Sequence, residues 1–69
     1  MVEVFKTNVQ EISHSQKMIQ KLLEHFPKSR INFDLEDCDK ILRVEDHQIH
    51  PEKVIEVLKL SGFDCLILD

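Results

Sequence analysis

The sequence predicts a single α+β domain built from two helices and four strands. Two segments, residues 14–26 and 51–61, repeat apolar side chains at helical spacing. Four segments rich in β-branched or alternating apolar residues are strand-like: residues 2–9, 31–35, 41–44 and 63–68. The 69 residues leave room for one core, because a second domain would need roughly another hundred residues.

The first strand and the start of the first helix are marked by local patterns. Residues 2–9 carry β-branched side chains throughout, with alternating apolar positions at Val2 and Val4. Ser13 followed three residues later by Gln16 matches a capping box, in which the hydroxyl and the amide satisfy two free N–H groups reciprocally. We therefore expect the first helix to begin next to this serine.

Both helices have residues that limit them. Pro27 should end the first helix, because the residue before a proline disfavours helical backbone. The second helix should begin at Pro51, which is tolerated at the first helical position, and end at Gly62, which supplies a left-handed cap. The expected apolar stripes are Ile19, Leu22, Leu23 and Phe26 in the first helix and Val54, Ile55, Val57 and Leu58 in the second.

The remaining strands complete a recognisable order. Residues 31–35 alternate apolar and polar side chains, and the acidic turn at residues 36–40 returns the chain as residues 41–44. Residues 63–68 form the last strand. The order βαββαβ in so short a chain favours a ferredoxin-like two-layer sandwich, an antiparallel sheet with both helices on one face. Right-handed crossovers predict the strand order 4-1-3-2.

This topology predicts which loops meet. One end should gather the loops at residues 10–13, 37–40 and 61–63, and the other should gather His25 with residues 46–50. The open sheet face should be charged and solvated. Its expected members are Glu3, Lys6, Asn32, Asp34, Glu36, Arg43 and Asp64.

Composition disfavours several classes of function. Nine Lys and Arg against thirteen Asp and Glu give a net charge of −4, and the scattered cations disfavour binding to nucleic acid or to an anionic membrane. No apolar run resembles a signal peptide or a membrane span. Two cysteines cannot build a disulfide framework, so we expect a cytoplasmic protein, although one intramolecular bridge is geometrically possible. With no catalytic motif, an enzyme is not expected.

Three segments carry a resemblance to a known family. They are residues 5–9 (Phe-Lys-Thr-Asn-Val), residues 39–45 (Asp-Lys-Ile-Leu-Arg-Val-Glu), and residues 54–55 with 62–63. Over nearly all 69 residues the sequence resembles the heavy-metal-associated domains of copper chaperones and metal-ATPase N-terminal modules. The resemblance implies a metal carrier. In relatives the first strand leads into a Cys-x-x-Cys motif whose thiolates bind Cu(I) or Zn(II), whereas residues 10–14 here read Gln-Glu-Ile-Ser-His.

Glu11 and His14 occupy the two cysteine positions in the preferred alignment, and a shift of one residue supplies no cysteine either. Carboxylate and imidazole suit Zn(II), Ni(II) or Cu(II) better than Cu(I). The hairpin expected at the same end adds Cys38 with Asp37 and Asp39, so Glu11, His14 and Cys38 form the candidate metal site. These side chains equally suit a helix start and the hydrogen bonds of a turn.

Two other groups carry side chains of metal-binding or nucleophilic type. His47 and His50, with His25 at the same end, form a second candidate cluster, although isolated histidine pairs are unspecific. Cys65 lies in an apolar strand, so we expect a buried, inert thiol with a raised pKa.

Two functions follow from these patterns, and a remnant without present function is a third possibility. The first is a small non-enzymatic binding module that lacks the thiolate pair, needs no cofactor and acts by contact with a protein partner, through the open sheet face or an edge strand. The second is a divergent protein that binds Zn, Ni or Cu through a rebuilt Glu/His/Cys site.

Overall fold

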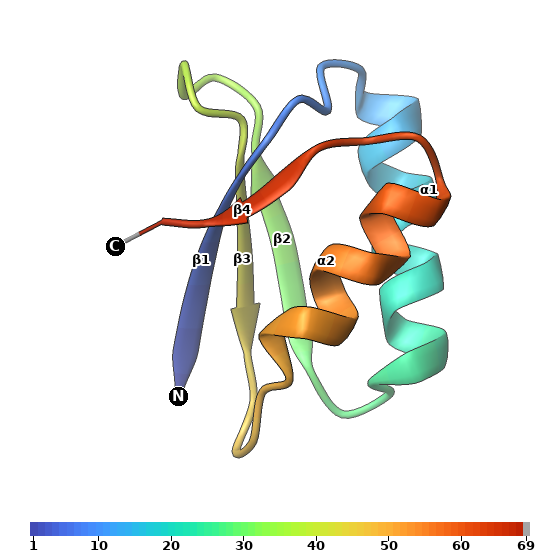
Figure 1. Cartoon of the computed structure of the whole chain (residues 1–69), viewed down its shortest axis with the longest axis vertical. Helices are drawn as coiled ribbons and strands as arrows, with labels where there is room; N and C mark the ends of the chain where they lie inside the picture. Colours follow the sequence, from blue (N-terminus) through green and yellow to red (C-terminus); the bar gives the residue numbers. More distant parts are fainter. Residues whose placement is uncertain (69) are drawn as a thin grey trace.

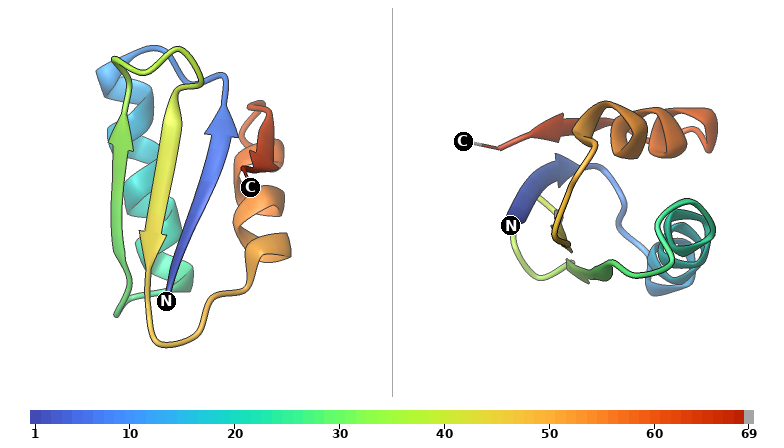
Figure 2. Two further views of the ribbon diagram at one scale, coloured as in Figure 1. Left: turned by 90° about the vertical axis from the view of Figure 1, so that its left-hand side faces the viewer. Right: turned by 90° about the horizontal axis from the view of Figure 1, so that it is seen from below.

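The computed structural model describes residues 1–68 and has the predicted order of elements. They are β1 (Val2–Thr7), α1 (Ile12–His25), β2 (Arg30–Asp34), β3 (Ile41–Glu45), α2 (Pro51–Leu60) and β4 (Cys65–Ile67). All three strand pairs are antiparallel, and the sheet order is β2-β3-β1-β4. Read from β4, this is the predicted order 4-1-3-2. Both helices cover one face of the sheet, which confirms the ferredoxin-like α+β class (Figures 1 and 2).

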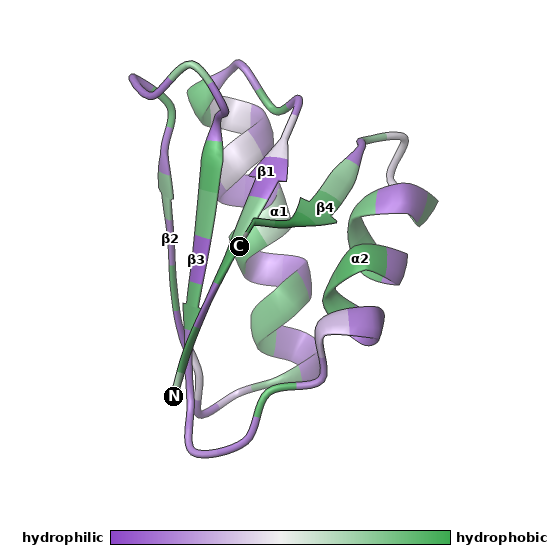
Figure 3. Ribbon diagram, turned by 60° about the vertical axis from the view of Figure 1, so that its left-hand side comes forward, coloured by the Kyte–Doolittle hydropathy of each residue, from purple (hydrophilic) through white to green (hydrophobic). Residues whose placement is uncertain are grey.

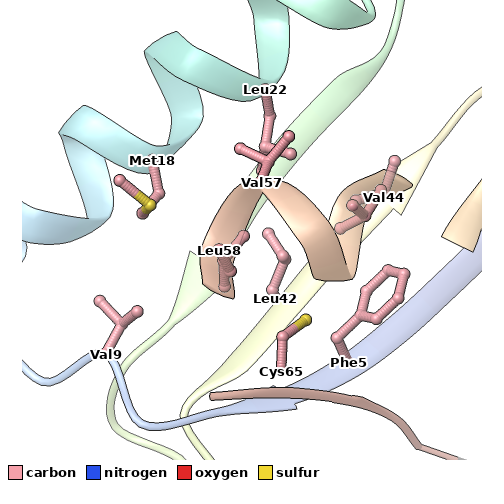
Figure 4. Packing of buried hydrophobic residues seen from close by; sticks show 10 residues of the cluster. Phe5, Val9, Met18, Leu22, Leu42, Val44, Val57, Leu58 and Cys65 are labelled. Atoms are coloured by element: carbon pink, nitrogen blue, oxygen red, sulfur yellow. The ribbon is translucent and has the colours of Figure 1, made fainter. Parts of the chain in front are cut away.

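The core lies between the sheet and the two helices. Phe5 of β1 is fully buried and lies opposite Leu42 of β3, which in turn lies opposite Phe33 of β2. The buried cluster consists of Phe5, Val9, Met18, Leu22, Leu42, Val44, Val54, Val57, Leu58 and Cys65. Figure 4 shows these side chains gathered from the sheet and from both helices. The thiol of Cys65 is part of this core, as predicted.

The start of α1 differs from the prediction. The helix begins at Ile12, and Glu11 stands at its N-cap without a side-chain hydrogen bond to the backbone. Ser13 therefore lies inside the helix, and the predicted capping box was wrong. Val9 is buried, and its N–H donates to Thr7 Oγ1 at 3.2 Å. These contacts hold the chain close to the end of β1, so only a short link precedes the helix.

The buried stripe of α1 is also shifted. Ser15, Met18 and Leu22 are its buried residues, whereas Ile19, Leu23 and Phe26 are half-buried. Of the predicted stripe, Leu22 is buried and Phe26 packs against the core from a half-buried position, whereas the prediction missed Ser15 and Met18 as buried positions. The helix ends at His25, two residues before Pro27, as predicted.

The ends of α2 match the prediction closely. Pro51 occupies the first helical turn, and Gly62 follows the helix with a φ of +91°. The N–H of Gly62 donates to Lys59 O at 3.0 Å, and the N–H of Phe63 donates to Leu58 O at 3.0 Å. These two bonds form a Schellman motif, which requires the left-handed backbone that glycine adopts without a steric penalty.

The face that β1 presents to the helices is set by its aromatic residue. Since consecutive side chains of a strand point to opposite faces, Glu3 shares a face with Phe5, while Val2 and Val4 lie on the open face. The prediction that Glu3 belongs to the open face was therefore wrong. The physical reason is that a buried phenylalanine removes more apolar surface from water than a valine does.

Candidate functional site

The three loops predicted to meet at one end of the sheet do meet there. The β2–β3 hairpin is tied to β1, because Thr7 Oγ1 donates to Lys40 O at 2.6 Å and Thr7 N–H donates to Asp39 O at 3.1 Å. The turn after α2 is tied to the β1–α1 loop, because Asp64 N–H donates to Asn8 Oδ1 at 2.8 Å. These hydrogen bonds join the segments at the end of the sheet that carries the candidate metal ligands.

Glu11 and His14 lie together at the start of α1. His14 Nδ1 is 3.7 Å from Glu11 Oε2, as the spacing of three residues on a helix allows. The His14 ring also packs on Phe63, with ring centroids 5.5 Å apart and planes tilted by 54°. The imidazole is thus held by a carboxylate on one side and an aromatic ring on the other.

Cys38 lies in the hairpin with a different set of neighbours. Among residues 1–68, the one group of at least three possible ligands whose atoms lie within 4.8 Å of one another is Asp37, Cys38 and Asp39. Glu11 and His14 are outside this group, so the structure does not bring the three predicted ligands together.

Both carboxylates of the hairpin group already have partners. Asp37 Oδ1 accepts the N–H of Asp39 at 2.9 Å, which closes a side-chain turn. Asp39 Oδ1 lies 3.6 Å from Lys6 Nζ. The turn and the ion pair account for these acidic residues without a metal ion.

The second thiol of the chain is not a ligand for this end. Cys65 is 1% exposed, and burial raises the pKa of its thiol from 9.0 to about 12, although nearby Lys59 acts in the opposite direction. Both cysteines are free, Cys38 at the surface and Cys65 in the core. Because a carrier of Cu(I) needs paired soft thiolates, the donor set of this chain does not fit a two-thiolate copper site.

The second histidine cluster is not assembled either. His25 and His50 both lie against Phe26, with ring centroids 6.2 and 6.4 Å away. Nearby, the Ser29 hydroxyl donates to the Asp46 carboxylate. This hydrogen bond is the main reason that the pKa of Asp46 lies below its ordinary value. Within residues 1–68, this end holds no group of three possible ligands, and two of its imidazoles, those of His25 and His50, lie against the Phe26 ring.

Metal titration provides a direct test of this end of the fold. After treatment with a chelator, the untagged chain should show the same Tm with and without one equivalent of Cu(I), Zn(II), Ni(II) or Cu(II) under reducing conditions. An ion present at a hundred times its Kd would add about 2.7 kcal/mol to the free energy of unfolding. For so small a domain this would raise the Tm by roughly 10 °C or more. A saturating rise that is lost in His14→Ala or Cys38→Ser would contradict this prediction.

The open sheet face carries an apolar patch that sequence analysis missed. We call Val2, Val4, Leu66 and Leu68 the open-face patch. Leu66 pairs with Lys6 and so shares the face of Val4, and Leu68 N–H continues the pairing by donating to Val4 O at 2.8 Å. Figure 3 shows the apolar colour running along β4 toward the C-terminus.

The patch is exposed to solvent. Val2 is 53% exposed, Leu66 62% and Leu68 37%. The expectation of a uniformly charged face was therefore wrong on the β1–β4 side, while Asn32, Asp34 and Arg43 on the β2–β3 side are exposed as predicted. The sequence does contain a sign of this patch, which is the unbroken apolar run after Cys65. Consecutive side chains of a strand point to opposite faces, so an unbroken apolar run has apolar side chains on both faces of the sheet.

Comparison with known proteins adds no assignment: no family model, curated protein or solved structure matches this chain. The described helices, of 14 and 10 residues, are neither long nor apolar enough to cross a membrane. The structure is that of a small α+β domain that exposes an apolar patch on the open face of its sheet.

Proposed function

We propose that this domain is a small non-enzymatic binding module, a divergent relative of heavy-metal-associated domains without their thiolate pair, that acts by contact with a protein partner. The observation that carries the proposal is the open-face patch, in which apolar side chains of two adjacent strands are exposed side by side. Contiguous exposed apolar surface on a soluble domain is typical of an interaction site. We also propose a cytoplasmic location, which suits two free thiols.

The charges around the patch indicate the chemistry of the partner. Arg43 lies directly opposite Val4, and Lys6 lies directly opposite Leu66, so two cations border the apolar side chains on the same face. One carboxylate, that of Glu45, lies opposite Val2 at the far end of the patch. Lys6 remains more than half exposed despite its ion pair with Asp39. The partner we propose therefore presents apolar side chains flanked by carboxylates, and complementary charges set the rate of encounter.

A transition-metal protein that uses Glu11, His14 and Cys38 is the weaker alternative. Its three donors do not form one group, and the nearest carboxylates are already engaged in a turn and an ion pair. A metal ion would have to recruit these side chains from the start of α1 and from the β2–β3 hairpin. The metal titration above distinguishes this alternative from the protein-binding module.

Retention of a partner by immobilised variants tests the proposal. The wild-type chain should retain a protein from a lysate of its source, and Leu66→Lys should lose most of this retention because it places a cation in the apolar contact. Leu60→Lys is the matched control, since Leu60 is 80% exposed on α2 and lies outside the patch. Arg43→Glu should weaken retention by reversing one bordering charge. Equal retention by Leu66→Lys and Leu60→Lys, or none by the wild type, would argue against the proposal.

A further inference from the structure

The outer edge of the sheet at β2 has a pattern that is complementary to itself. β2 is the last strand on its side of the sheet and pairs only with β3 among the described residues (Figure 2). Its five residues read Arg-Ile-Asn-Phe-Asp, with an alternating pattern of exposure. Arg30, Asn32 and Asp34 are exposed on the open face, whereas Ile31 and Phe33 are half-buried on the helix side.

Antiparallel pairing of two copies of this strand brings complementary side chains together. With Asn32 on the two-fold axis, Arg30 of each copy lies opposite Asp34 of the other, which makes two attractive charge pairs on the open face. Ile31 of each copy lies opposite Phe33 of the other, which adds two apolar pairs beside the helices. Directly opposite residues on antiparallel strands are close enough to interact in this way. A two-fold interface requires this kind of self-complementarity.

The charged residues of this edge are free to pair with another chain. Neither Arg30 nor Asp34 has an oppositely charged group within 4 Å in residues 1–68. Asp34 Oδ1 makes only a 3.2 Å contact with the N–H of Glu36. The strand also contains no proline and no charged side chain on the helix side, two devices that commonly prevent edge pairing.

We propose that two copies of this chain associate through antiparallel β2–β2 pairing to form one eight-stranded sheet. The occupant of this edge is thus a second copy of the chain, selected by the two Arg30–Asp34 pairs. This inference does not depend on the proposed function, because β2 and the open-face patch lie at opposite sides of the sheet. In the dimer the two patches lie at the two outer sides of one continuous face.

Sedimentation equilibrium of charge-reversed variants tests the dimer. The average mass of the untagged wild type should rise with concentration from that of one chain, 8.2 kDa, toward that of two. Arg30→Asp and Asp34→Arg each convert two attractive pairs into two repulsive ones, so each should weaken association by about tenfold or more. Lys17→Glu on α1 makes an equal change of charge away from this edge and should leave association unchanged.

Two further samples restore the opposite charges and so test the Arg30–Asp34 pairing itself. An equimolar mixture of Arg30→Asp and Asp34→Arg should associate, because each chain then meets only opposite charges on the other. The double variant with both substitutions should associate with itself like the wild type. A monomeric wild type at every concentration, or single variants that associate as well as the wild type, would overturn the proposal. Failure of both the mixture and the double variant to recover association would overturn it too.

Covalent capture gives a second measurement that does not depend on charge. In the Cys38→Ser background, Asn32→Cys should oxidise to a disulfide-linked dimer, because the two copies of residue 32 lie opposite each other at the two-fold axis. Lys59→Cys, at an exposed position of α2, should remain largely monomeric under the same conditions. Equal yields from the two positions would indicate random collision and contradict the proposed register.

Discussion

Replacing Leu42 with alanine is expected to leave little or no folded protein at room temperature. Leu42 is fully buried in the central strand β3, between Phe5 of β1 and Phe33 of β2. Truncation of such a leucine costs about 2–5 kcal/mol, because both the transfer energy and the packing around it are lost. A domain of this size rarely has more than about 3–5 kcal/mol of stability. Urea unfolding followed by circular dichroism measures the loss.

The matched control removes the same atoms from the surface. Leu60 is also a leucine, but it is 80% exposed at the end of α2. Leu60→Ala should change the free energy of unfolding by no more than about 0.5 kcal/mol. If Leu42→Ala unfolds at the same urea concentration as Leu60→Ala, the core described for this chain is incorrect.

Alkaline pH is expected to destabilise the domain through Cys65. The unfolded thiol has a pKa of 9.0, whereas burial raises the pKa in the folded state to about 12. Between these values the unfolded chain releases a proton that the folded chain keeps, so the free energy of unfolding falls as the pH rises. The full difference corresponds to about 4 kcal/mol, at 1.36 kcal/mol per unit. The contribution of this thiol is independent of pH below about 9.

Urea unfolding at several pH values between 8 and 12 measures this effect. Cys65→Val keeps an apolar side chain of similar size and removes the ionisable group, so its stability should depend much less on pH in this range. Cys38→Ser provides the control, because Cys38 is exposed and this variant retains Cys65. A wild-type stability that is flat up to pH 12, or a slope that persists in Cys65→Val, would show that the buried thiol is not responsible.

The two proposed interactions use different sides of one sheet: the open-face patch would bind a partner, and the β2 edge would pair with a second copy. The patch lies on β1 and β4, where apolar side chains face solvent, and the self-complementary edge lies two strands away. Binding of a partner and pairing of two copies therefore need not compete for the same surface. Variants at Leu66 and at Arg30 should accordingly affect one property each.

The sequence by itself determined the order of elements, the end of the first helix and both ends of the second. Pro27 and Pro51 restrict the backbone wherever they stand, and Gly62 is the residue best suited to the left-handed conformation after α2. Apolar periodicity was sufficient to distinguish helix from strand, and the right-handed crossover rule then supplied the strand order. These constraints act within short stretches of sequence or follow from the handedness of chains of L-amino acids. They can therefore be inferred from the sequence without knowing which distant residues are in contact.

Only the tertiary structure decided which face of each element is buried and which loop residues meet. β1 has apolar residues on both faces, so its orientation depended on Phe5 packing against Leu42, a contact between distant parts of the chain. That choice placed Val2 and Val4 on the open face and created the patch. The sequence likewise predicted that residues 10–13, just before the first helix, and the hairpin holding Cys38 would lie at the same end, but whether the side chains of His14 and Cys38 converge depends on ångström-scale contacts. The His14 ring packs on Phe63, which lies far along the chain from it. In the hairpin, Asp37 closes a turn by accepting the N–H of Asp39.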